Sequence, residues 1–258
     1  MDEPDVFEVS MEIARVEYPD LDVPLYRSRV EELGREGRAR VKSKGRRAVE
    51  QFNAYFFDAL GFHGNADDYY DPRNSYLNDV IDRRTGIPIT LSMIYCELGR
   101  RAGLRAHGVG FPGHFLAKCL SAEGDVIVDC FNARTVSRED CQELLNSFSP
   151  GGPPVSDEML EIASPRDILS RMLANLRRIH AGRGEYARAL RWIDMDMTLR
   201  PGSPHNFRER GMLYIQMEEF GKAIVDLERY VHDSPGASDL SKVREQIQLI
   251  RKLLSHLN

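Results

Sequence analysis

The sequence predicts a mostly helical α+β chain, in which a first domain with a small antiparallel sheet is followed by an all-α repeat unit. Apolar residues recur at helical spacing over residues 5–60 and 88–101, and they change to short β-branched and aromatic runs between residues 105 and 129. The C-terminal third is helical again and resembles itself at an offset of 34 residues. A chain of 258 residues is long enough for two such domains.

Three helices are predicted before Gly61. Apolar positions keep helical spacing there, and we place the breaks between helices at Pro19, Pro24 and Gly34. The stretch from Gly61 to Asn74 is rich in Asp, Asn, Gly and Tyr, which is typical of a surface loop. The first domain therefore begins with helices and reaches its central part through a long loop.

A further helix is predicted from Pro88 to Arg101. Proline in the first turn costs no hydrogen bond, because that N–H has no partner within a helix, and Gly103 is a suitable stop. Three short strands follow, and we expect them to be adjacent and antiparallel. Their predicted ranges are residues 105–110, 114–120 and 125–129.

The segment from Ser149 to Pro154 is the strongest linker signal, because it holds two glycines and three prolines in six residues. We predict a first domain at residues 1–160 and a repeat unit at residues 165–258. The offset of 34 residues is the period of tetratricopeptide repeats, and residues 238–257 are predicted to form a capping helix. At this offset the paired positions are Arg177 and Gly211, His180 and Tyr214, Tyr186 and Phe220, Ala189 and Ala223, Ile193 and Leu227, and Pro201 and Pro235.

Composition narrows the function classes. The 35 Lys and Arg against 40 Asp and Glu give a formal charge of -5, which argues against a nucleic-acid partner. No window approaches 18 consecutive apolar residues, and the N-terminus is acidic where a signal peptide is basic, so we expect a cytoplasmic protein with no membrane association. The four cysteines form no Cys-x-x-Cys pair and are interpreted as reduced thiols. The histidine spacing predicts no metal site, and we expect no cofactor.

A basic run stands out within this acidic chain. We interpret it as a solvated connection between helices, and the alternative is a surface for an acidic partner. Its members are Arg35, Arg38, Arg40, Lys42, Lys44, Arg46 and Arg47.

Four short segments carry a resemblance to a known family. They are residues 77–80 (LNDV), 84–92 (RTGIPITLS), 110–116 (GFPGHFL) and 128–131 (VDCF). In these segments the chain resembles the transglutaminase-like fold of the SirB-type family, in which such a domain precedes tetratricopeptide repeats. The resemblance implies a transglutaminase-like, cysteine-protease-like first domain and a regulatory role.

The resemblance also implies where a catalytic site would lie. Catalytic members of this fold carry a cysteine at the start of the central helix, a histidine at the next strand and an aspartate on the strand after it. A helix N-terminus and a neighbouring histidine lower the pKa of such a thiol and make it a nucleophile. Here His114 and Asp129 match the histidine and the aspartate, whereas Pro88 stands at the cysteine position.

No other cysteine is expected to replace the nucleophile. Strand alternation turns Cys119 and Cys130 away from the histidine and the aspartate. Cys96 lies eight residues into the helix, which is roughly 12 Å along its axis. Ser92, one turn beyond the proline, is the candidate hydroxyl nucleophile, with Thr90 behind it.

Three interpretations of His114 and Asp129 stay open. They are a structural polar pair that holds two strands in register, part of a ligand cleft with Asn78 and Pro88, or part of a hydrolase or acyl-transferase site that acts on amide or ester bonds with Ser92 or another nucleophile. Because the cysteine is missing, we expect a non-catalytic regulatory or protein-interaction protein and call His114 and Asp129 the relic pair.

The first helix of each repeat is expected to line a concave face. Guanidinium groups bind carboxylates with two hydrogen bonds, so this face is predicted to bind a protein partner. The alternative is that two repeats leave no free groove and dock on the first domain. The predicted protein-binding residues are Arg171, Asn175, Arg178 and Arg208.

Overall fold

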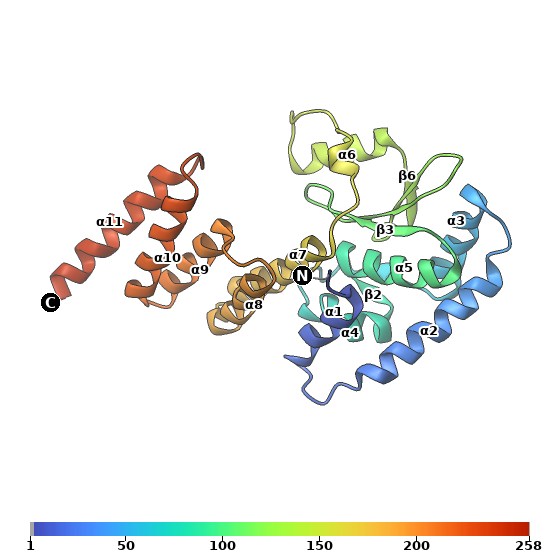
Figure 1. The fold of residues 1–258 in the computed structure, drawn as a ribbon, viewed down its shortest axis with the longest axis horizontal. Coiled ribbons are helices and arrows are strands. Elements are labelled where there is room, and N and C mark those ends of the chain that lie inside the picture. The colour runs from blue at the N-terminus through green and yellow to red at the C-terminus, as the bar shows by residue number, and fades with distance from the viewer. Residues whose placement is uncertain (1–2, 258) are drawn as a thin grey trace. The chain divides into compact units, whose positions relative to one another are not determined.

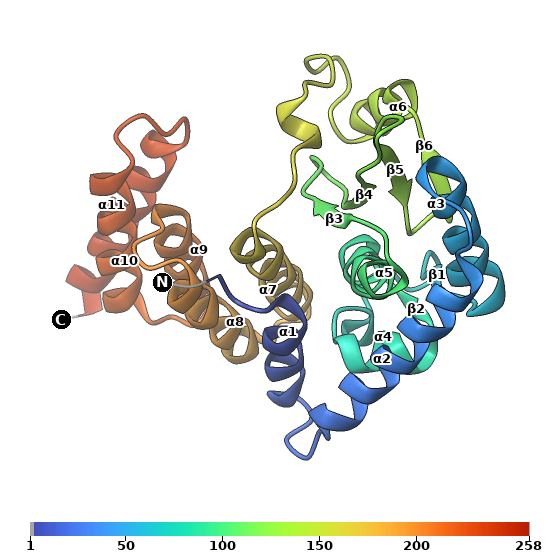
Figure 2. The same ribbon diagram turned by 45° about the vertical axis from the view of Figure 1, so that its right-hand side comes forward.

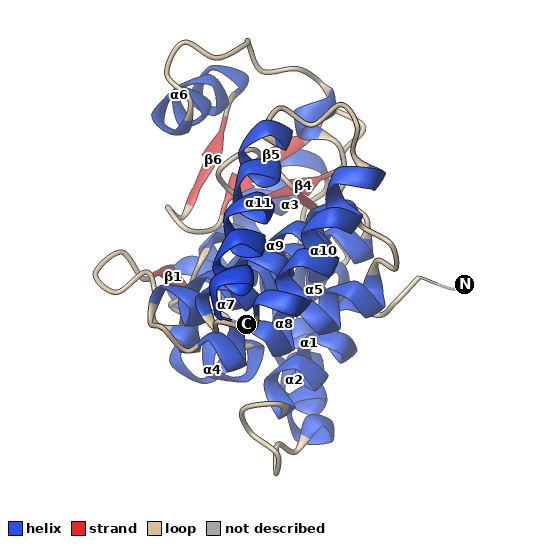
Figure 3. Ribbon diagram, turned by 90° about the vertical axis from the view of Figure 1, so that its left-hand side faces the viewer, coloured by secondary structure: helices blue, strands red, loops and turns tan. Residues whose placement is uncertain are grey.

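The computed structural model describes residues 3–257. The chain folds as two compact units, residues 1–172 and 173–258. Helices dominate, and the strands are confined to the first unit (Figure 3). This confirms the predicted fold class. The boundary between the units falls within α7 (Pro165–Gly182), and the predicted domain ranges of 1–160 and 165–258 stay a prediction.

The N-terminal part forms three helices, as predicted. Aspartates begin the first two, because the side chain of Asp5 accepts from the N–H of Glu8 and that of Asp22 from the N–H of Leu25. The helices are α1 (Val6–Arg15), α2 (Val23–Arg40) and α3 (Gly45–Asn53), which continues as a π-helical turn η1 (Ala54–Ala59).

The predicted break at Gly34 is wrong. Helix α2 runs through it and ends at Arg40, and Pro24 lies within the first turn of that helix. A Cβ atom on Gly34 would overlap the Cβ of Arg101. Glycine at this position therefore lets α2 approach a neighbouring helix closely, and it does not interrupt α2.

Helix α5 (Pro88–Ala102) is the centre of the first unit. It packs against α2 and α4 (Leu77–Arg83) and against two strands of the sheet, and Figure 2 shows it between the sheet and these helices. Gly103 ends α5 with a φ of 98°, as its position predicted. Twelve of its fifteen residues are buried, which explains why its sequence is apolar on most sides.

The main sheet has the strand order β3-β4-β5-β6, and all its pairs are antiparallel. Figure 1 labels β3 and β6 of this sheet, and Figure 2 labels all four strands. The three predicted strands are present and adjacent. Strand β6 was not predicted, because it is three residues long and mostly exposed. The strands are β3 (Ala106–Val109), β4 (Leu116–Cys119), β5 (Val126–Asp129) and β6 (Arg134–Val136).

Shorter elements complete the first unit. Two two-residue strands, β1 (His63–Gly64) and β2 (Thr85–Gly86), pair in parallel and tie the long loop to the start of α5. Helix α6 (Arg138–Phe148) follows the sheet and begins with a capping box at Ser137. Single 3-10 turns are η2 (Pro72–Asn74) and η3 (Glu158–Leu160).

The second unit consists of helical hairpins. Both bounds of α10 lie 34 residues after those of α8, so the offset in the sequence is an offset in the structure. Gly211 is required by this packing, since a Cβ atom there would lie 2.8 Å from the Cγ of Leu227. After α7 the helices are α8 (Tyr186–Leu199), α9 (Pro204–Gln216), α10 (Phe220–Asp233) and α11 (Leu240–Leu257).

Candidate functional site

His114 and Asp129 form a buried, hydrogen-bonded pair. Asp129 is the last residue of β5 and His114 lies in the turn before β4, which brings residues 15 positions apart together. The His114 Nε2 lies 2.9 Å from Asp129 Oδ1, and the two side chains are 6% and 1% exposed. No described residue hydrogen-bonds to the other ring nitrogen, Nδ1. It is therefore the nitrogen left for a further partner.

The carboxylate of Asp129 is held by several donors. The N–H groups of Phe131 and Asn132 donate to Oδ1 at 3.1 and 3.2 Å, and the Asn132 side chain donates to Oδ2 at 2.7 Å. Burial acts to raise the pKa of Asp129, but the hydrogen bond and charge of His114 and the bonds from Asn132 outweigh it, so the pKa lies below its ordinary value. Asp129 is thus ionised at neutral pH and orients the imidazole.

Two aromatic rings border the His114 imidazole. The ring of Phe131 meets it edge-on at 6.3 Å between centroids, and Phe148 at the end of α6 stacks on it at 6.5 Å. Phe148 is 54% exposed although it covers this face. Gly113 makes room for it, because a Cβ atom there would overlap the Phe148 side chain. One face of the imidazole is therefore covered by a ring that solvent reaches.

Arg171 holds the backbone of the turn that carries His114. Its Nη2 donates to the carbonyls of Phe111 and His114 at 2.8 and 2.5 Å, and its guanidinium lies 5.6 Å from the ring centroid of Phe115. Arg171 was predicted to belong to a partner-binding surface. Its hydrogen bonds to the turn that carries His114 were not predicted. No local pattern indicates them, because the carbonyls are 57 and 60 residues away in sequence.

The start of α5 is linked to the relic pair through a chain of contacts. Gly86, two residues before Pro88, pairs with Gly64. Gly64 lies against the Phe131 ring, since a Cβ atom added to Gly64 would be 2.5 Å from that ring. The Phe131 ring in turn contacts the His114 imidazole edge-on. Pro88 itself is buried. The residue at the expected nucleophile position thus belongs to the same part of the fold as the relic pair.

Ser92 is fully buried and bonded elsewhere. Its Oγ donates to the carbonyl of Phe115 at 3.4 Å, and its side chain also bonds the thiol of Cys130. No hydrogen bond joins Ser92 to His114 in the described part of the chain. A hydroxyl nucleophile needs such contact with its base, so a catalytic role of Ser92 stays a prediction with no contact to support it.

The four cysteines are free and buried. Burial raises the pKa of each thiol, and that of Cys119 to about 11. A thiol with a raised pKa is protonated at neutral pH and is a poor nucleophile. The thiols therefore behave as small apolar core groups.

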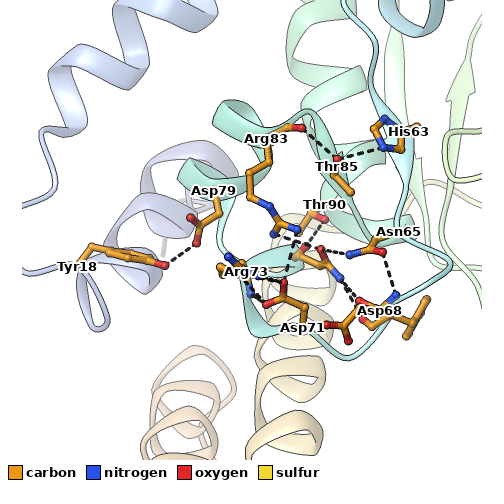
Figure 4. A network of polar contacts seen from close by, with 12 residues as sticks. Tyr18, His63, Asn65, Asp68, Asp71, Arg73, Asp79, Arg83, Thr85 and Thr90 are labelled. Carbon is orange, nitrogen blue, oxygen red and sulfur yellow. Dashed lines mark hydrogen bonds and ion pairs between the residues drawn. The ribbon is translucent and has the colours of Figure 1, made fainter.

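A polar network fixes the loop before α4 (Figure 4). Asp71 accepts from Arg73 and pairs with Arg83 at 3.5 Å, and Thr90 on α5 donates to the carbonyl of Asn74 at 2.7 Å. Burial acts to raise the pKa of Asp71, but the bonds from Arg73 outweigh it and lower the pKa. This network ties the long loop to the first turn of α5.

Asn78 follows this loop on α4 and belongs to the predicted cleft. Its side chain is buried, and its Oδ1 has no hydrogen-bond partner among the described residues. Of the predicted cleft residues Asn78, Pro88, His114 and Asp129, the structure joins His114 and Asp129 by a direct bond. The ligand-cleft role of the set stays a prediction.

The second unit contains a groove of about 680 Å³ between α7 and α9. Arg178 lines it and makes no ion pair with a described residue. Of the other predicted binding residues, Arg208 pairs with Glu209 and Asp239 at 2.6 Å each, and Asn175 does not line the groove. The groove-lining residues are Arg177, Arg178, Ala181, Gly182, Tyr186, His205, Glu209, Met212, Leu213 and Gln216.

Two observations on the described residues concern other site classes. No three His, Cys, Asp or Glu side chains gather there in a geometry that would hold a metal ion. None of the helices between residues 3 and 257 is both long and apolar enough to span a bilayer.

Comparisons with known proteins agree with this architecture. Residues 25–174 match the transglutaminase-like superfamily, and residues 176–248 match the tetratricopeptide repeat. A UPF0162 protein of Xylella fastidiosa (strain Temecula1 / ATCC 700964) is 39% identical over 238 residues, covering 90% of this chain and 85% of that protein. A UPF0162 protein of Vibrio cholerae is 28% identical over 202 residues, or 78% of this chain and 75% of that protein.

A part of the chain is also similar to a larger protein. F-box only protein 21 of Homo sapiens is 32% identical over 137 residues, which is 50% of this chain and 21% of that protein. The long match to UPF0162 proteins and the match over residues 25–174 settle the family. The chain belongs to the transglutaminase-like superfamily, and within it to the UPF0162 proteins, with a tetratricopeptide repeat at its C-terminal end.

Proposed function

We propose that this chain is a non-catalytic protein that binds a protein partner through the groove of its repeat unit. The observation that carries the proposal is the groove between α7 and α9, because it combines a volume of about 680 Å³ with an arginine, Arg178, that makes no ion pair with a described residue. Such a cation binds a carboxylate without first breaking an internal bond. An acidic segment of a partner protein fits these properties.

The geometry of the first unit supports the non-catalytic part of this proposal. By the resemblance to the transglutaminase-like fold, proline stands at the cysteine position of catalytic domains. All four thiols are buried with raised pKa values, and the buried Ser92 donates to a backbone carbonyl. The relic pair lacks a hydrogen-bonded nucleophile among the described residues. The resemblance to SirB-type proteins favours a regulatory role for the binding event, in the cytoplasm.

Retention from a cytosolic extract tests the proposal. The immobilised wild-type chain is compared with Arg178→Glu, His114→Ala and, as a matched charge reversal outside the groove, Arg191→Glu, because Arg191 is exposed and makes no ion pair with a described residue. We expect a specific set of proteins that only Arg178→Glu fails to retain. Equal retention by all four forms would exclude the groove as the binding surface, and a loss confined to His114→Ala would move the function to the relic pair.

A second candidate is a hydrolase or acyl-transferase that uses His114 and Asp129. The bond of 2.9 Å between His114 Nε2 and Asp129 favours it, because a carboxylate held at one ring nitrogen orients the other, here Nδ1, toward a reacting group. It requires Ser92 or a nucleophile supplied by the substrate. Turnover of amide or ester substrates by the wild type that disappears in His114→Ala would establish this activity and overturn the non-catalytic proposal.

A further inference from the structure

The basic run extends from the last turns of α2 to the first turn of α3. None of its seven side chains makes an ion pair with a described residue, whereas Arg100 and Arg101 on the neighbouring α5 both pair with Glu97. All seven are exposed. Within a chain of net charge -5, this is a local excess of positive charge that the described residues do not neutralise.

Part of the run lines a cavity of about 650 Å³ in the first unit. A cavity of this size falls in the range of small-molecule sites. Cations reach it from three elements: Arg38 near the end of α2, Lys44 before α3, and Arg105 before β3. The Arg38 guanidinium lies at the wall, since its Nη1 is 3.4 Å from the position of a Cβ atom on Gly103. We call this site the basic cavity.

Neutral hydrogen-bond donors add to these charges. The hydroxyl-bearing residues Ser43 and Ser121 line the basic cavity, and so do Gly45 and Ala48 in the first turn of α3. Helix α3 has no side-chain cap, because its N-cap residue is Lys44. The free N–H groups of such a turn complement an anion that the cations have attracted.

One carboxylate lies in the basic cavity. The Glu123 side chain, at the exposed tip of the β4–β5 hairpin, places Oε2 only 2.6 Å from the position of a Cβ atom on Gly45. An anionic group of the chain thus lies beside the start of α3. Because Glu123 is exposed and makes no ion pair with a described residue, it is free to move aside for a ligand.

We propose that the basic cavity binds a small ligand through a phosphate or polyphosphate group. Three cations, hydroxyl groups and free N–H groups gather around one concave site and match the several acceptor oxygens and multiple charge of such a group. An extended acidic peptide would instead require the cations to follow a line on an open surface. The cations outside the cavity raise the local positive potential and increase the rate of capture.

Isothermal titration of the full chain with inorganic pyrophosphate tests this proposal. We expect saturable binding to the wild type and a loss of affinity of about tenfold or more for each of Arg38→Ala, Lys44→Ala and Arg105→Ala, since a charged hydrogen bond contributes about this factor. Arg46→Ala is the matched control, because Arg46 belongs to the same run but does not line the cavity. Its affinity should stay within about threefold of wild type.

Glu123→Gln gives a result in the opposite direction. Removal of the competing negative charge should tighten pyrophosphate binding severalfold. Thermal melts of every variant identify loss of folding, and the exposed Lys44→Ala keeps the test valid if Arg38→Ala unfolds. Absence of binding, equal loss in Arg46→Ala, or binding of polyglutamate but not of pyrophosphate would each overturn the proposal, and the last result would assign the run to an acidic protein.

Discussion

Replacement of Arg171 by methionine should destabilise the first unit. The substitution keeps the aliphatic stem but removes both hydrogen bonds to the carbonyls of Phe111 and His114. Hydrogen bonds from a charged group contribute about 1.5–3 kcal/mol each. Because Arg171 is half-buried and water replaces part of the loss, we expect the free energy of unfolding to fall by about 2–3 kcal/mol.

Urea unfolding followed by far-ultraviolet circular dichroism measures this loss. With a slope of about 2 kcal/mol per molar urea, the midpoint should fall by about 1 M. The chain has one tryptophan, the buried Trp192 in the second unit, so its fluorescence follows that unit separately and should shift less. Arg178→Met is the matched control, because it makes the same change seven residues later on α7 at a side chain without an ion pair to a described residue.

Equal urea midpoints for Arg171→Met and Arg178→Met would refute the stabilising role given to Arg171. A midpoint for Arg171→Met within about 0.2 M of Arg178→Met would mean that the two hydrogen bonds contribute less than about 0.5 kcal/mol. A larger shift in Trp192 fluorescence than in ellipticity would assign the effect to the second unit.

Three further predictions concern packing, acid stability and thiol chemistry. Gly34→Ala should lower the free energy of unfolding by about 1–3 kcal/mol because its Cβ meets the Arg101 side chain, whereas Gly221→Ala, with nothing within 4 Å, should not lower it; thermal melts compare them. The lowered folded-state pKa of Asp129 stabilises the fold above about pH 4, its value in the unfolded chain, and this contribution is lost as pH falls through the folded pKa. Urea midpoints between pH 2 and 6 should therefore fall more steeply for wild type than for Asp129→Asn. The four buried cysteines should react with an aromatic disulfide reagent at pH 8 only after unfolding.

Each of these predictions has a contrary result. Equal melting temperatures for the two glycine variants would mean that α2 shifts without cost. Parallel pH profiles for wild type and Asp129→Asn would mean that the pair contributes no pH-dependent stability. Rapid reaction of one or more thiols with the native chain would show an accessible cysteine and reopen the search for a nucleophile.

The sequence was informative where local patterns decide the structure. The helix that begins at Pro88 and ends at Gly103 and the 34-residue offset of the repeats follow from spacing and from turn residues. The break predicted at Gly34 was wrong because glycine is required there by a tertiary contact: it allows α2 to lie close to Arg101 on α5. The local sequence does not show whether a glycine ends a helix or allows another helix to pack closely against it.

The candidate site also contains residues that the sequence predicted and contacts that it did not predict. His114 and Asp129 were identified from the resemblance to the transglutaminase-like fold, and the structure joins them by a hydrogen bond. The role of Arg171 and the stacking of Phe148 were not predicted, because both contacts depend on how distant elements pack. The basic run was visible as a charge pattern, but the cavity that suits it to a small ligand depends on Arg105, far along the chain.

Introduction of a cysteine at the start of α5 tests the central claim that the relic pair is a catalytic arrangement without its nucleophile. In Pro88→Cys, the rate of alkylation by iodoacetamide is measured against pH, alone and combined with His114→Ala, with Thr90→Cys as a comparison two residues on. We predict a thiol pKa clearly below the ordinary value of about 8.5 in Pro88→Cys, returned toward that value by His114→Ala. A thiol pKa in Pro88→Cys at or above about 8.5 that His114→Ala leaves unchanged would contradict the claim.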